Sequence, residues 1–261
     1  MSHAIITHLG HVDPVMKQLI AVAGPFVMAT REEHSPFEAL VRAIAHQQLH
    51  GKAAQSILNR FILSCGRGSF PEPEALLALE DAALRAAGFS FSKIAALRDL
   101  ATKTLSGIVP HGDALHELSD LDIIERLTAV RGIGRWTVEM LLMFQLRRPD
   151  VLPVDDFGVR YGFRLAYGLK QMPAPKVLAM FGERWAPYRS AAAWYLWRAV
   201  DLARAGQLPP PAEVLKLPRL PRKRRKSKRA AASSVRPKRS GARTRARRPP
   251  ARRSRAPAKK K

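Results

Sequence analysis

The sequence of 261 residues is long enough for one or two domains, and its 46% content of hydrophobic residues suffices for a globular core. Its single cysteine, Cys65, excludes an internal disulfide framework, a multi-cysteine zinc site and a four-cysteine iron–sulfur cluster. The formal net charge of +24 is uneven, because residues 207–261 contain 22 of the 45 Lys and Arg residues and one acid, Glu213. There is no long apolar run and no signal-peptide pattern. We therefore expect no membrane span and an intracellular protein, in the cytoplasm or nucleoid if it is bacterial.

The spacing of apolar residues predicts an all-α fold over residues 1–206, although residues 1–30 give no clear pattern. Ser35 with Pro36 in the first turn is a typical helix start, and apolar residues then recur at helical spacing as far as Phe61. The predicted helices, in chain order, span residues 35–61, 71–87 (one or two short helices ended by Gly88), 92–105, 121–130, 135–146, 156–167 and 187–205.

These patterns divide the chain into an N-terminal extension (1–34), a helical domain (35–206) and a basic tail (207–261). The tail begins near three consecutive prolines and has almost no large apolar residue after Leu220. Such a segment cannot bury enough surface to offset the entropy lost on ordering. We therefore expect it to be a disordered polycation.

The segment Leu127–Thr137 places Gly132, Ile133 and Gly134 between two predicted helices. Glycines in such a turn can adopt positive φ and bring bare backbone close to a partner. The N–H groups at the start of the second helix carry a partial positive charge, which suits a phosphate. An ordinary helix–helix turn is the alternative, and the presence of Arg135 after the turn favours phosphate binding.

Two adjacent carboxylates, Asp155 and Asp156, follow Pro153 and open the predicted helix over residues 156–167. Asp is favoured at a helix N-terminus, where it accepts hydrogen bonds from free N–H groups, and the helix dipole favours its ionised form. Capping requires only one of the two residues. The other is available for chemistry, and the local sequence alone leaves both interpretations open.

The glycine turn and the two carboxylates, about twenty residues apart, resemble the helix-hairpin-helix DNA glycosylase superfamily, most closely its 3-methyladenine DNA glycosylase II branch. The similarity extends to the segments Ala43–Lys52 (AIAHQQLHGK) and Arg184–Trp197, and covers roughly residues 35–205. It implies two helical subdomains with a helix-hairpin-helix motif and a cleft between them. It also implies an enzyme that removes alkylated bases from DNA in base excision repair.

The resemblance implies a catalytic carboxylate. Such enzymes extrude the target nucleotide, because the glycosidic bond is inaccessible in the stacked duplex. An alkylated purine is cationic and already a good leaving group, so an anion beside the sugar stabilises the oxocarbenium-like transition state and can help to activate water. Counting back from Arg160 and Phe163 assigns this role to Asp156, with Asp155 capping the helix or orienting its neighbour. Counting forward from Pro153 assigns it to Asp155.

The resemblance also implies a base pocket formed by Trp136, Trp197 and Met140, in which an electron-rich indole stacks on a cationic base. Both tryptophans could alternatively be core residues. Bifunctional relatives carry, at the position of Trp136, a Lys that forms a Schiff base with the sugar. Because Trp cannot attack a carbon, we expect a monofunctional hydrolase without lyase activity. Some relatives have Tyr in place of Met140, which leaves the preferred base open.

Gln48 matches the family residue that fills the gap left by the extruded nucleotide, and a polar helix end is the alternative. The residues expected to contact DNA are Gly132, Ile133, Gly134, Arg135, Thr137, Gln48, His50, Lys52 and Arg160. We expect no metal or redox cofactor in the chemical step. The resemblance does imply a structural Na⁺ or K⁺ ion at the hairpin, held by the backbone carbonyls of Thr128, Val130 and Ile133.

The expected partner is double-stranded DNA with an extruded damaged base, bound by a monomer. The tail is expected to raise non-specific DNA affinity through counterion release, with solubility or localisation as its alternative role. Two other functions remain open: a glycosylase for another lesion, such as a deaminated or oxidised base, and a non-catalytic DNA-binding protein with a histone-like tail. Asp156, Trp136 and Trp197 favour an enzyme, because phosphate binding requires none of them.

Overall fold

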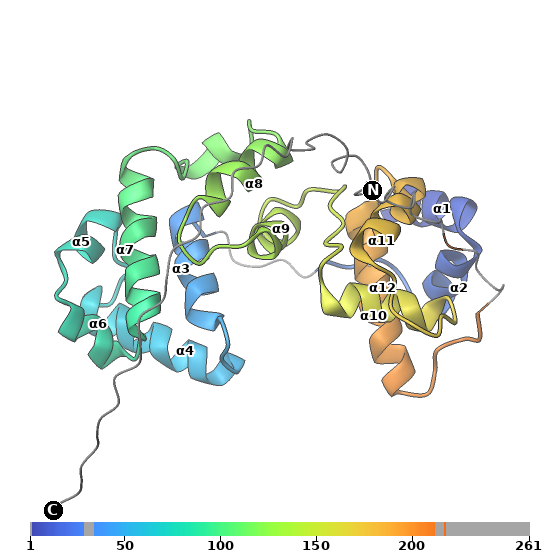
Figure 1. The fold of residues 1–261 in the computed structure, drawn as a ribbon, viewed down its shortest axis with the longest axis horizontal. Coiled ribbons are helices and arrows are strands. Elements are labelled where there is room, and N and C mark those ends of the chain that lie inside the picture. The colour runs from blue at the N-terminus through green and yellow to red at the C-terminus, as the bar shows by residue number, and fades with distance from the viewer. Residues whose placement is uncertain (1, 29–33, 212–216, 218–261) are drawn as a thin grey trace, which may run out of the picture. The chain divides into compact units, whose positions relative to one another are not determined.

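The computed structural model describes residues 2–28, 34–211 and 217, all within one unit of the chain, Met1–Leu220. Over these residues the chain forms helices and turns and no strand, which confirms the predicted all-α fold (Figure 1). Apart from residues 207–211 and 217, the segment predicted to be a disordered tail lies outside the described residues.

The α-helices are α1 (Ser2–Val12), α2 (Pro14–Ala23), α3 (Pro36–His46), α4 (Gly51–Arg60), α5 (Pro73–Ala78), α6 (Asp81–Ala87), α7 (Phe91–Leu105), α8 (Asp120–Thr128), α9 (Arg135–Phe144), α10 (Phe157–Ala166), α11 (Pro175–Gly182) and α12 (Arg189–Arg204). Shorter helical turns are η1 (Phe61–Cys65), η2 (Gly112–Leu115) and η3 (Glu183–Trp185). The sequence pattern did not predict α1, α2 or α11.

The helix predicted over residues 35–61 starts as expected but is not continuous. The Ser35 hydroxyl accepts a hydrogen bond from the Glu38 N–H at 3.1 Å, and Pro36 occupies the first turn. Residues 47–50 then interrupt the helix between α3 and α4, because Gln48 adopts a left-handed backbone with φ of 58°. The prediction of one helix over this range was therefore wrong.

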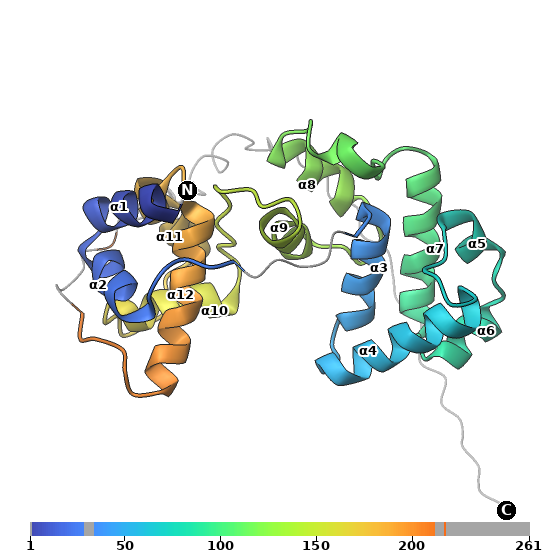
Figure 2. The ribbon, with the colours of Figure 1, turned by 180° about the vertical axis from the view of Figure 1, so that it is seen from behind.

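The helices form two groups that correspond to the two expected subdomains. Helices α3 to α7 pack on one another in the first group, and α1, α2 and α10 to α12 pack together in the second. The α8–α9 pair is the helix-hairpin-helix motif, and in both views α9 lies between α3 and α10 (Figures 1 and 2). In the second group, a Cβ atom on Gly162 would lie 1.9 Å from the carbonyl oxygen of Leu196, so only glycine allows α10 and α12 to approach this closely.

Residues 2–28, which the sequence set apart as an extension, are part of the second helical group. Helices α1 and α2 pack on each other, and α2 packs on α12. Asp13, which is 1% exposed, accepts hydrogen bonds from the Tyr167 hydroxyl at 2.6 Å and the Trp185 indole N–H at 2.9 Å. This buried carboxylate ties the N-terminal helices to residues far along the chain.

The helical body also extends past residue 206. Leu208 and Leu217 pack against the core, and a Cβ on Gly168 would meet Pro211 Cγ at 2.7 Å. Among the described residues, no helix has both the length and the apolar character needed to cross a membrane.

Candidate active site

The hairpin between α8 and α9 has the backbone that its glycines predict. Gly132 has φ of 77°, and Gly134 is the extended N-cap residue of α9. Val130 and Ile133 are buried at 1% and 4% exposure and anchor the turn in the core. The turn therefore presents the N-terminal N–H groups of α9 with no side chain at either glycine.

Two contacts brace the hairpin from the first helical group. The Gln47 side-chain amide donates a hydrogen bond to the Gly132 carbonyl at 2.8 Å, and the Arg131 N–H donates to Asp99 Oδ2 at 2.7 Å. Burial raises the pKa of Asp99, but the hydrogen bonds and charges of Lys103 and Arg131 outweigh it and leave the pKa below its usual value. One backbone carbonyl of the hairpin is thus bound to the end of α3, and one backbone N–H is bound to α7.

The structure brings Asp156 together with both predicted pocket tryptophans. Asp156 Oδ2 accepts a hydrogen bond from the Trp136 indole N–H at 2.8 Å, and Oδ1 accepts one from the Trp197 indole N–H at 2.9 Å. Oδ1 also accepts the Val159 N–H at 2.7 Å, which makes Asp156 the N-cap of α10. Three donors from three helices therefore orient this one carboxylate.

Asp155 has a different environment. Its side chain is exposed. Among the described residues, neither indole N–H group that donates to Asp156 donates to the Asp155 carboxylate. The interpretation that Asp155 caps α10 is wrong, because Asp156 is the capping residue. Asp156 both caps α10 and accepts the two indole hydrogen bonds. The expectation that one of the two aspartates caps the helix while the other serves catalysis therefore does not describe this site.

Gly158 makes the contact between Trp197 and Asp156 possible. A Cβ atom on Gly158 would lie 2.8 Å from Trp197 Cδ1 and 3.2 Å from Asp156 Oδ1. Real Cβ contacts are essentially never as short as the first of these, so any larger residue at this position must displace the indole. The sequence pattern shows this glycine in the first turn of a predicted helix but gives no sign of its contact with Trp197.

We expect Gly158→Ala to slow the proposed base release about 10- to 100-fold, the cost of losing one hydrogen bond to a charged group. Thermal stability should change little, because Ala favours a helix more than Gly. Trp197→Phe removes the same hydrogen bond without adding a Cβ and should give a similar loss under single-turnover conditions. An unchanged rate in Gly158→Ala would contradict this role of the glycine.

A cavity of about 640 Å³ lies between α3 and α9, and its lining residue Trp136 is hydrogen-bonded to this carboxylate. Trp136, Thr137 and Met140 of α9 line one wall, and Gln48 after α3 lines another. Trp136 is 50% exposed, which is high for an indole that also donates a hydrogen bond. Trp197 does not line the cavity but stacks on the lining residue Phe144, with ring centroids 5.9 Å apart and planes 23° apart.

The other residues expected to contact DNA are distributed over three places. His50 and Lys52 are exposed at the start of α4. Arg135 is 55% exposed beside the hairpin. Arg160 is half-buried, and its Nε donates a hydrogen bond to the Pro173 carbonyl at 3.1 Å, so this side chain already has a partner within the protein.

A buried carboxylate behind the hairpin was not anticipated. Glu139 is 3% exposed and accepts a hydrogen bond from Arg135 Nε at 2.8 Å. Burial raises the pKa of Glu139, Arg135 lowers it, and the charges of Asp155 and Asp156 raise it, with a net increase. Its structural effect is to orient the exposed Arg135 next to the hairpin.

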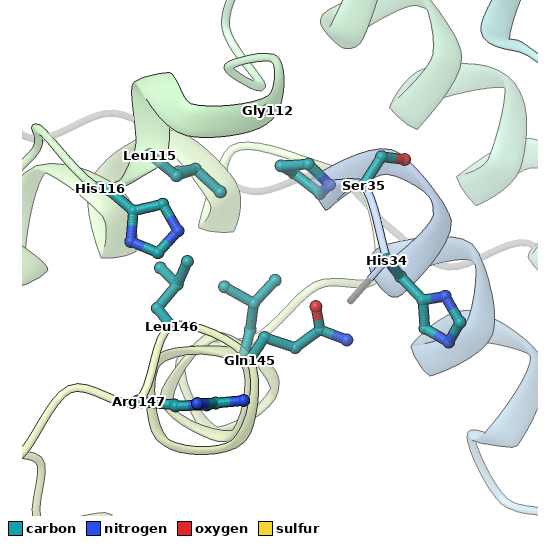
Figure 3. A pocket seen from close by; sticks show the side chains of 10 residues that line it. His34, Ser35, Gly112, Leu115, His116, Gln145, Leu146 and Arg147 are labelled. Atoms are coloured by element: carbon teal, nitrogen blue, oxygen red, sulfur yellow. The ribbon is translucent and has the colours of Figure 1, made fainter. Parts of the chain in front are cut away.

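A second cavity, of about 560 Å³, lies at the C-terminal end of α9 (Figure 3). It shares His34, Leu141 and Gln145 with the first cavity. Its walls come from the start of α3, from η2 and from the end of α9. Trp136 is not among the described residues that line it, whereas Trp136 lines the first cavity and donates a hydrogen bond to Asp156 Oδ2. We therefore place the candidate site at the first cavity.

A known protein family matches the sequence of this chain. Residues 41–187, more than half of it, match the family described as HhH-GPD superfamily base excision DNA repair protein. The chain belongs to this superfamily. The resemblance inferred from the sequence motifs is thereby confirmed, and so is the helix-hairpin-helix fold.

Several superfamily members are similar to the chain over most of their length. DNA-3-methyladenine glycosylase 1 of Schizosaccharomyces pombe is 44% identical over 75% of this chain and 86% of the relative. The alkylbase DNA glycosidase-like protein mag2 of the same organism is 32% identical over 77% of this chain and 94% of the relative. The solved structure of the S. pombe 3-methyladenine DNA glycosylase in complex with abasic DNA has 42% sequence identity and a TM-score of 0.67, covering 77% of this chain and 98% of that one.

Proposed function

We propose that this protein is a monofunctional DNA glycosylase that hydrolyses the N-glycosidic bond of alkylated bases in double-stranded DNA. The observation that carries the proposal is the Asp156 carboxylate, which is oriented by Trp136, Trp197 and the N-terminus of α10, together with the cavity of about 640 Å³ that Trp136 lines. The relatives named DNA-3-methyladenine glycosylase, including those of S. pombe and Escherichia coli, support the same conclusion.

The chemistry follows from the charge of an alkylated purine. The base leaves readily because it is already cationic, and positive charge then develops on the deoxyribose. A fixed carboxylate next to that sugar stabilises the developing charge without reorganising. The same carboxylate can accept a proton from the attacking water. No group that would activate an uncharged leaving base is needed for this step.

The cavity supplies binding for the extruded base. The partly exposed indole of Trp136 offers a π face to a cationic base, an interaction that strengthens as water is excluded. Met140 adds a polarisable apolar contact and, unlike Tyr, provides no hydroxyl to hydrogen-bond the base. This composition favours bases recognised through charge and shape over bases recognised through one polar group.

The hairpin supplies binding for the DNA backbone. The N–H groups at the start of α9, flanked by Arg135, suit a phosphate. Gln48, which is exposed and has φ of 58°, would enter the gap left by the extruded nucleotide. The strained backbone at this residue is consistent with such a role.

A monovalent cation remains part of the proposal. Thr128 is the last residue of α8, and Val130 and Ile133 flank Gly132 in the turn that follows. The Val130 carbonyl accepts the Ile133 N–H at 3.0 Å, and its second lone pair remains available, so the turn fits a carbonyl-bound ion. The ion would supply positive charge for a phosphate. We also propose that the protein acts as a monomer and that the basic tail strengthens non-specific DNA binding.

The proposal is tested by incubating the full chain with methylated DNA and measuring the free bases released. Release of 3-methyladenine or 7-methylguanine supports it. Release only from duplexes with deaminated or oxidised bases would assign the site to another lesion. Tight binding without release from any of these substrates would favour the non-catalytic alternative.

We expect the reaction to stop at an abasic site. Trp136 has no amine, so no Schiff base can form with the sugar at this position. A gel of end-labelled lesion duplex should show an intact strand after incubation and cleavage only after hot alkali. Strand cleavage in neutral buffer, together with a borohydride-trapped covalent complex, would contradict the monofunctional assignment.

A further inference from the structure

A row of aromatic and cationic side chains runs along α10 and starts with the exposed ring of Phe157, directly after Asp156. Phe157 stacks on Tyr161, with ring centroids 5.6 Å apart and planes 12° apart. The Arg164 guanidinium lies 4.8 Å from the centre of the Tyr161 ring. We name Phe157, Tyr161 and Arg164 the α10 ladder.

The outer ring of this ladder has no role in the core. Phe157 is 65% exposed and is not among the residues of the hydrophobic core cluster. It occupies the first position of a helix, where an acidic residue would interact more favourably with the helix dipole. Tyr161 has a neighbour on each side, because its ring contacts both the Phe157 ring and the Arg164 guanidinium.

Resting on the proposed function, we propose that Phe157 stacks on a nucleobase next to the extruded nucleotide. When a nucleotide leaves the duplex, its neighbour loses a stacking partner and exposes a π face. Aromatic side chains bind such unstacked bases in a sequence-tolerant way. Phe157 immediately follows the carboxylate proposed to face the extruded deoxyribose, so the adjoining nucleotide is the nearest π partner on the DNA.

The surroundings of Phe157 favour a base over other partners. An apolar protein surface or a membrane would need a wider apolar patch. Phe157 instead follows two carboxylates, Asp155 and Asp156, and precedes Gly158. The Phe157 ring, which stacks on Tyr161, has about the area of one nucleobase. Arg164 adds positive charge on the same helix for the nearby phosphates.

The test uses the full chain and a duplex in which a tetrahydrofuran abasic analogue has 2-aminopurine on its 5′ or its 3′ side. Stacking on an aromatic ring quenches 2-aminopurine. We expect the wild-type protein to quench one of the two positions. Phe157→Ala should lose this quenching and bind the duplex on the order of tenfold more weakly. Phe157→Trp should restore both.

Leu121→Ala is the matched control. Leu121 is 72% exposed at the start of α8, at the opposite end of that helix from the hairpin turn. This variant should bind and quench like wild type. Phe157→Leu keeps an apolar side chain without a π face, so it should remain unquenched if the contact is stacking.

The outcomes separate this inference from the proposed function. Wild-type base release combined with Phe157→Ala binding and quenching that match wild type would overturn the stacking contact and leave the glycosylase intact. Quenching that Phe157→Leu retains would also overturn it, because an apolar contact would then suffice. If Phe157→Ala is less stable, recovery by Phe157→Trp still decides the question. No base release from any lesion would instead reject the proposed function itself.

Discussion

Asp156→Asn is expected to reduce base release from methylated DNA by about 10²- to 10³-fold or more, the loss typical of removing one preorganised electrostatic group. Asn keeps the cap of α10, because it is as good an N-cap residue as Asp. It removes the negative charge and places its amide NH₂, a donor, opposite one of the two indole N–H groups. The fold should therefore survive while the stabilisation of the developing cation is lost.

Asp155→Asn is the control for this variant, since it removes one charge at the adjacent, exposed position. We expect it to retain most of the release rate. Both variants should bind a tetrahydrofuran-containing duplex within a few-fold of wild type. If Asp155→Asn is inactive and Asp156→Asn is active, the catalytic role belongs to Asp155.

Asp13→Ala is expected to lower the free energy of unfolding by roughly 3–5 kcal/mol, since it leaves two buried donors without partners and removes a helix cap. The lost contacts are those from the Tyr167 hydroxyl, from the Trp185 indole and from the Val15 N–H, at 2.6, 2.9 and 3.0 Å. Burial raises the pKa of Tyr167 and persists in the variant, so the phenol stays protonated and its buried hydroxyl is left without this partner.

Thermal and urea unfolding of the full chain measure this effect, which corresponds to a drop of about 10 °C in Tm for a domain of this size. Tyr167→Phe removes one donor together with its need for a partner, so it should cost only about 1 kcal/mol. At a temperature where both variants are folded, base release should match wild type. A loss below 1 kcal/mol in Asp13→Ala would show that the N-terminal helices are not anchored through this carboxylate.

The sequence was sufficient for the parts of the site that depend on local patterns. Gly132 could be recognised because a short turn with φ of 77° favours glycine. Asp156 could be placed at a helix start for the same local reason. Its meeting with Trp136 and Trp197, which lie 20 and 41 residues away along the chain, followed only from the family resemblance.

The remaining features depend on contacts between distant segments, which no local pattern encodes. Asp13 resembles an ordinary helix cap in the sequence, and its buried partners lie 154 and 172 residues away. The interruption after α3 could not be predicted, because the apolar spacing of the sequence continues through it. The hydrogen bond from the Gln47 side chain to the Gly132 carbonyl joins this interruption to the distant hairpin. Gly158 is informative only once Trp197 is known to pack against it.

The most direct test of the central claim compares binding to two uncleavable duplexes at one salt concentration. One contains a cationic pyrrolidine in place of the damaged nucleoside, and the other contains the neutral tetrahydrofuran. Because enzymes bind analogues of the transition state more tightly than neutral analogues, the wild-type protein should prefer the pyrrolidine by about 10²-fold or more. Asp156→Asn should lose that preference while binding the neutral duplex normally. Equal affinity of the wild-type protein for both duplexes would contradict a carboxylate acting on the deoxyribose.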